Sequence, residues 1–94
     1  IREVAEKDST NTYAHMMLAK GSLLSGQYDK AIDRLQTVIR LEPSNAEAML
    51  ILADVFERTG DKTGAITWYR NSLAVIKQAE ARTAIEKRIE ELEK

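Results

Sequence analysis

The chain has 94 residues, 44% of them hydrophobic and 31% charged, a balance that is typical of one small folded domain and argues against a disordered chain. Fourteen basic and fifteen acidic residues give a net charge of -1, so the basic excess expected of proteins that bind nucleic acids or anionic membranes is missing. The absence of cysteine excludes disulfides and thiolate metal sites. Because the first residue is Ile1, we expect a fragment or a processed form, and the localisation stays unknown.

Helical periodicity dominates the first half of the chain. Apolar residues recur at helical spacing from Asn11 to Ser25 and again from Tyr28 to Leu41, where they form one stripe. Pro43 cannot continue the second of these segments, so a turn is expected there. No alternating apolar and polar run of useful length predicts a strand.

Two further helices are predicted after this turn. Ser44 and Glu47 have the spacing of a capping box, which predicts a helix start near Asn45. Gly60 marks the end of that helix, and Asp61 is a natural N-cap for the next one.

The last segment, over residues 78–94, has a different composition. It is rich in Glu, Lys, Arg and Ala, which are good helix formers. One narrow apolar stripe runs along it, consisting of Ala81, Ile85, Ile89 and Leu92. The carboxylates of Glu86, Glu90, Glu91 and Glu93 are interpreted as a solvated outer face rather than as an acid–base site.

The chain repeats itself with an offset of 34 residues, most visibly in "GQYDKAI" and "GDKTGAI". Identical residues coincide at Asn11/Asn45, Ala14/Ala48, Leu18/Leu52, Ala19/Ala53, Gly26/Gly60, Ala31/Ala65 and Ile32/Ile66. The matches lie on the apolar stripes and the turn, and the differences lie on the polar faces. In each copy a glycine is expected to end one helix, and an alanine to lie where the next helix crosses it closely.

This spacing resembles the tetratricopeptide repeat (TPR) family. Its characteristic positions are occupied in the second copy by Met49, Leu52, Ala53, Phe56, Ala65 and Tyr69, and in the first by His15, Leu18, Ala19, Ser22, Ala31, Leu35 and Pro43. His15 and Ser22 depart from the aromatic residues that are usual there, and Lys77 departs from proline. Ser22 is therefore expected to loosen the packing of the first copy.

The resemblance implies an all-α solenoid, a TPR-like superhelix of helix-turn-helix repeats. We expect a single domain over residues 1–94: the end of a preceding repeat over 1–11, repeats over 12–45 and 46–77, and a C-terminal capping helix over 78–94. Ile1, Val4 and the first apolar stripe would remain partly uncovered, so further repeats are expected upstream.

Catalytic and metal chemistry find little support in the sequence. His15 is the single histidine and occupies a packing position, and one histidine without cysteine does not make a zinc site. The pair Lys62-Thr63 lacks the glycine spacing and the preceding strand of a phosphate-binding loop. We therefore expect a non-catalytic protein without metal or cofactor.

The resemblance implies a concave groove that binds a peptide or another protein. The matching positions are Tyr13, Met16, Met17, Lys20, Leu23 and Leu24 in the first copy, and Glu47, Leu50, Ile51, Asp54, Glu57 and Arg58 in the second. Of the apolar members, Met16 and Leu50 are expected to be exposed in the groove, whereas Met17, Leu24 and Ile51 are expected to pack between helices.

Some family members hold a C-terminal carboxylate with a clamp of Lys and Asn. Met16, Lys20 and Ile51 stand where that clamp needs Lys, Asn and Asn, so carboxylate-tail binding is not expected. Trp68 is expected to pack on the terminal helix near Ile85, and exposure on the convex side is the alternative. The main alternative function is structural, with self-association through the repeat ends. Nucleic-acid binding, membrane insertion and catalysis are not expected.

Overall fold

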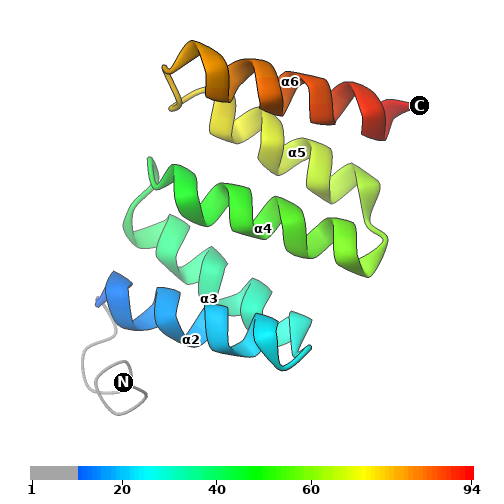
Figure 1. The fold of residues 1–94 in the computed structure, drawn as a ribbon. Coiled ribbons are helices and arrows are strands. Elements are labelled where there is room, and N and C mark those ends of the chain that lie inside the picture. The colour runs from blue at the N-terminus through cyan, green and yellow to red at the C-terminus, as the bar shows by residue number, and fades with distance from the viewer. Residues whose placement is uncertain (1–10) are drawn as a thin grey trace.

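The computed structural model describes residues 11–94, and these form five α-helices connected by short turns (Figure 1). The helices are α2 (Thr12–Leu24), α3 (Tyr28–Leu41), α4 (Ala46–Thr59), α5 (Lys62–Leu73) and α6 (Ala79–Glu93). Each packs mainly against the helix before and after it in the chain, so the helices form a row with α2 and α6 at opposite ends. No strand occurs within residues 11–94, and the prediction of an all-α helical repeat is confirmed.

The helix boundaries follow the 34-residue repeat. Asn11 and Asn45 are the N-caps of α2 and α4, and each side chain accepts a hydrogen bond from the backbone N–H three residues later. Gly26 and Gly60 have φ angles of 77° and 85°, a left-handed conformation that glycine adopts without the penalty of a side chain. The expected N-cap role of Asp61 is confirmed by its hydrogen bond from the Gly64 N–H.

The prediction of a capping box at Ser44 is wrong. Asn45 caps α4 in its place. Glu47, the other half of the predicted box, instead forms an ion pair with Lys20 of α2. An asparagine one residue later offers the same kind of acceptor, and it also repeats the arrangement at Asn11.

The core lies where neighbouring helices cross. Its central cluster combines small and large apolar side chains from α2, α3 and α4: Met16, Ala19, Ala31, Leu35, Val38, Ala48, Leu52 and Val55. Ala31 and Ala65 are fully buried, as the repeat predicted. Trp68 is half-buried and packs against this cluster, so the expectation that it packs rather than lies exposed is confirmed.

The last helix is attached by packing and by polar contacts. α6 lies against α5 and buries Ile85 and Ile89, as its narrow stripe predicted. Arg82 donates hydrogen bonds to the backbone carbonyls of Leu73 and Ile76. These carbonyls lie at and just after the end of α5, where no further helical turn can donate a hydrogen bond to them. The expected end of a preceding repeat, including Ile1 and Val4, lies outside the described residues.

Candidate functional site

An exposed apolar stripe runs along α2. Tyr13 is 70% exposed, Met17 36% and Leu24 90%. Successive helical residues turn by about 100°, so positions i, i+4 and i+11 lie on the same side of the helix. Three large apolar side chains are thus exposed to solvent on one side of α2. A contiguous group of such side chains commonly marks a contact site.

The structure reverses part of the expectation for α2. Met16 is only 7% exposed and belongs to the central cluster, so the prediction that it is exposed is wrong. The prediction that Met17 and Leu24 pack between helices is also wrong, because both are exposed. Met16 lies in the central cluster, and a turn of about 100° moves its neighbour Met17 out of it.

The corresponding side of α4 is largely charged. Glu47, Arg58 and the half-buried Asp54 occupy it together with the half-buried Leu50 and Ile51. Ile51 packs against the central cluster, which confirms its expected role. Below, the α2–α4 face means the nine residues that share this side of the two helices: Tyr13, Met17, Lys20, Leu24, Glu47, Leu50, Ile51, Asp54 and Arg58.

Opposite charges on the α2–α4 face are paired with one another. The Lys20 ammonium lies 3.1 Å from the Glu47 carboxylate and links α2 to α4. Within α4, the Arg58 guanidinium lies 2.9 Å from Asp54, and the hydrogen bond to Asp54 raises the pKa of Arg58. Two cations and two anions thus cancel, and the apolar side chains of α2 are the part of this face left without a partner among residues 11–94.

Glu57, another expected groove residue, lies in a cluster that joins three helices. Its carboxylate in α4 accepts hydrogen bonds from the Tyr69 hydroxyl of α5 and from the Arg88 guanidinium of α6. The bond from Arg88 lowers the pKa of Glu57. Burial, followed by the bond to Glu57, raises the pKa of Tyr69 to about 12. This cluster holds helices together and was not predicted from the sequence, because its members lie 12 and 31 residues from Glu57.

Comparison with known proteins agrees with this architecture. A family model described as tetratricopeptide repeat matches residues 16–82, which is 67 of the 94 residues. The chain belongs to the tetratricopeptide repeat family. No curated protein sequence matches it. TPR domains generally mediate interactions between proteins, and their repeats are typically non-catalytic interaction modules.

His15, one of the two departures from the TPR pattern in the first repeat, is buried and 4% exposed. Its Nδ1 lies 3.2 Å from a guanidinium nitrogen of Arg34 in α3. The burial of His15 and its contact with Arg34 agree with the interpretation of His15 as a packing residue.

Residues 11–94 contain neither a metal-binding cluster nor a membrane-spanning helix. No group of three or more His, Cys, Asp or Glu side chains there has an arrangement that could hold a metal ion. None of the described TPR helices combines the length and the apolarity needed to cross a membrane. Lys62 and Thr63 form the first turn of α5 after the Asp61 cap, so they are part of a helix–helix turn.

Proposed function

We propose that this TPR domain binds a peptide or protein segment along the α2–α4 face, the groove of the repeat. The observation that carries the proposal is the exposed stripe of Tyr13, Met17 and Leu24. In a family whose domains generally mediate protein interactions, such a stripe is the natural contact for an incoming chain. Tyrosine suits this role because its large ring loses little conformational entropy when it is buried.

The pairing of charges on this face favours a partner segment that is itself apolar and nearly uncharged. Lys20 and Asp54 already have partners in Glu47 and Arg58, so a charged segment would have to displace existing ion pairs. Each large apolar side chain that becomes buried contributes about 1.5–3 kcal/mol, and association costs about 4–15 kcal/mol. Three anchors by themselves therefore leave at most about 5 kcal/mol, which corresponds to a dissociation constant no tighter than roughly 0.2 mM.

The test is a selection of peptides from a random library displayed on phage, followed by affinity measurements on the selected peptides. We expect enrichment of segments with two or more large apolar residues and few charges. Binding should be lost in a Tyr13→Glu, Leu24→Glu variant. The matched control is Gln36→Glu, Thr67→Glu, which adds the same charge at exposed positions of α3 and α5 and should bind as the parent chain does.

Two results would contradict the proposal. Equal affinity in the Tyr13/Leu24 variant and the control would move the site elsewhere. Affinity that falls steeply with salt would indicate an electrostatic contact, as in nucleic-acid binding, rather than an apolar one. Self-association through the repeat ends is the alternative function, and sedimentation distinguishes it, because the mass would then rise with protein concentration.

A further inference from the structure

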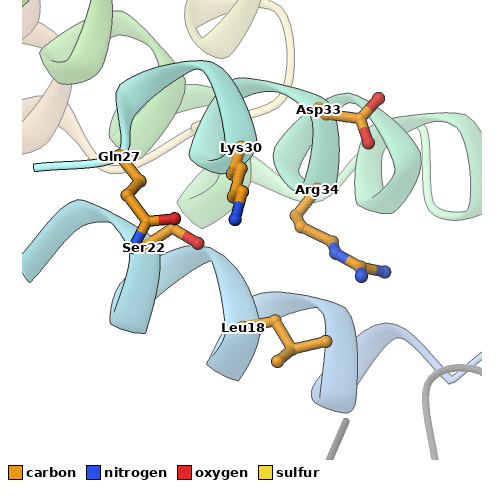
Figure 2. A pocket seen from close by; sticks show the side chains of 6 residues that line it. All are labelled: Leu18, Ser22, Gln27, Lys30, Asp33 and Arg34. Atoms are coloured by element: carbon orange, nitrogen blue, oxygen red, sulfur yellow. The ribbon is translucent and has the colours of Figure 1, made fainter. Parts of the chain in front are cut away.

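A pocket of about 330 Å³ lies between α2 and α3 (Figure 2). It is lined by Leu18 and Ser22 of α2 and by Gln27, Lys30, Asp33 and Arg34 from the start and the first turns of α3. The turn of about 100° per residue places Leu18 and Ser22 on a different side of α2 from Met17 and Leu24. The pocket is therefore separate from the α2–α4 face, and its volume is at the lower end of the range of about 300–1,000 Å³ found for ligand sites.

Two of the positions that line the pocket are aromatic in the second repeat. With the 34-residue offset, Ser22 corresponds to Phe56, and Arg34 corresponds to Trp68. Phe56 and Trp68 are half-buried and pack against the central cluster. The first repeat has a hydroxymethyl group and a guanidinium where the second has two aromatic rings. The pocket thus lies at positions where the second repeat carries these two rings.

A third position changes together with these two. Lys30 corresponds to Gly64, and a Cβ atom at Gly64 would lie 2.7 Å from Oδ2 of Asp61 and 3.1 Å from Cγ of Phe56. Glycine at that position therefore makes room both for the Asp61 side chain, which caps α5, and for the Phe56 ring. The first repeat has a lysine there, together with Gln27 and Ser22 in place of Asp61 and Phe56. The difference between the repeats is a coherent set of three positions rather than a single small residue.

The chemistry of the lining suits an aromatic guest. Leu18 provides an apolar wall, and Lys30 and Arg34 extend from α3 toward α2 (Figure 2). The hydrogen bond between Arg34 and buried His15 holds the guanidinium near the pocket. Arginine and lysine cations attract the face of an aromatic ring, most strongly that of tryptophan. The Ser22 hydroxyl and the Gln27 amide oxygen can accept a hydrogen bond from an indole N–H.

From this internal comparison we propose that the α2–α3 pocket receives an aromatic side chain of a partner polypeptide, and that tryptophan fits it best. The guest would lie at positions where the second repeat carries Phe56 and Trp68. The site does not depend on the α2–α4 face, so it gives this protein a second anchor point on another side of α2.

The test is a titration of the 94-residue chain with N-acetyl-L-tryptophanamide, followed by two-dimensional NMR of the ¹⁵N-labelled protein. We expect chemical-shift changes centred on Ser22, Gln27 and Lys30, with a dissociation constant on the order of millimolar, as suits a single side chain. N-acetyl-L-leucinamide should bind at least about fivefold more weakly, because it lacks the ring that a cation attracts.

Two variants separate the pocket from general surface binding. Ser22→Phe, Lys30→Gly copies two of the three positions from the second repeat. It should occupy part of the pocket and weaken probe binding at least about tenfold. Lys30→Glu leaves the space open but reverses an exposed charge, and should weaken binding about threefold or more. The Tyr13→Glu, Leu24→Glu variant should bind the probe as the parent chain does, so failure here is distinguishable from failure of the proposed function.

Several outcomes would overturn the proposal. One is shift changes that lie elsewhere or are equal for the tryptophan and leucine probes. Another is undiminished binding in folded Ser22→Phe, Lys30→Gly. If that variant does not fold, unchanged binding in Lys30→Glu has the same force. Shift changes at Lys30 and Arg34 with inorganic phosphate, but none with the tryptophan probe, would identify an anion site instead.

Discussion

The hydroxyl of Tyr69 donates a hydrogen bond of 2.5 Å to the carboxylate of Glu57, across the contact between α5 and α4. The same carboxylate receives the guanidinium of Arg88 from α6. One half-buried glutamate therefore connects three successive helices near the C-terminal end of the row. In a solenoid each unit is stabilised by its neighbours, so this contact couples α6 to the second repeat.

Alkaline pH should weaken this contact. The pKa of Tyr69 is raised to about 12 in the folded protein from 10.0, so its contribution is complete below pH 10 and is lost as the pH rises through about 12. Tyr69→Phe should reduce the free energy of unfolding by about 1 kcal/mol at neutral pH. The difference from the parent chain should shrink between pH 10 and 12.

Urea unfolding of both proteins from neutral pH to pH 11.5 would measure this difference. Tyr13→Phe is the control, since Tyr13 is 70% exposed and the loss of its hydroxyl should leave the unfolding midpoint unchanged. A Tyr69→Phe deficit that stays constant over the whole pH range would show that the hydroxyl does not act through its bond to Glu57.

Two adjacent methionines of α2 should respond in opposite ways to a charge. Met16→Glu would place a carboxylate in the central cluster, where Met16 is 7% exposed, and should cost about 3 kcal/mol or more. Met17→Glu alters an exposed side chain and should cost less than about 1 kcal/mol. Thermal unfolding followed by circular dichroism would compare the two variants. Similar melting temperatures would mean that Met16 is not a core residue.

The helices could be predicted from the sequence because their signals are local. Caps such as Asn11 and Asp61, the glycines at the turns and the apolar stripes each act within a few residues of the chain. The 34-residue repeat then identified the close crossings at Ala31 and Ala65, which are buried as expected.

The details of the candidate site could not be predicted in the same way. Whether Met16 or Met17 faces the next helix depends on a rotation of about 100°, which is set by how α2 lies against α3 and α4. The Glu57 cluster joins residues up to 31 positions apart, and no local pattern encodes such a contact. For the α2–α3 pocket, Ser22 was a signal in the sequence. A small side chain at a position that is usually aromatic leaves part of the packing volume unfilled.

The cap of α4 offers a direct test of a corrected prediction. Asn45 accepts the hydrogen bond of the Ala48 N–H at 3.0 Å, so Asn45→Ala should destabilise the protein by about 1 kcal/mol. Ser44 lies outside the helix without this role, and Ser44→Ala should change stability by less than about 0.5 kcal/mol. The urea unfolding midpoints of the two variants would show which of the two residues caps α4. A larger loss for Ser44→Ala would restore the capping box.

Two glycines of the first repeat should show opposite responses to the same substitution. Gly26 ends the turn after α2 with φ of 77°, a conformation that costs an alanine about 1–2 kcal/mol. Gly21 lies within α2, and a Cβ atom there would meet no atom within 4 Å. Gly21→Ala should therefore stabilise the protein by about 0.5–1 kcal/mol through higher helix propensity.

Because space around Gly26 is equally open, steric crowding cannot account for a loss of stability in Gly26→Ala. Melting temperatures that fall for Gly26→Ala and rise for Gly21→Ala would locate the effect in the backbone conformation, and a rise for both would contradict it.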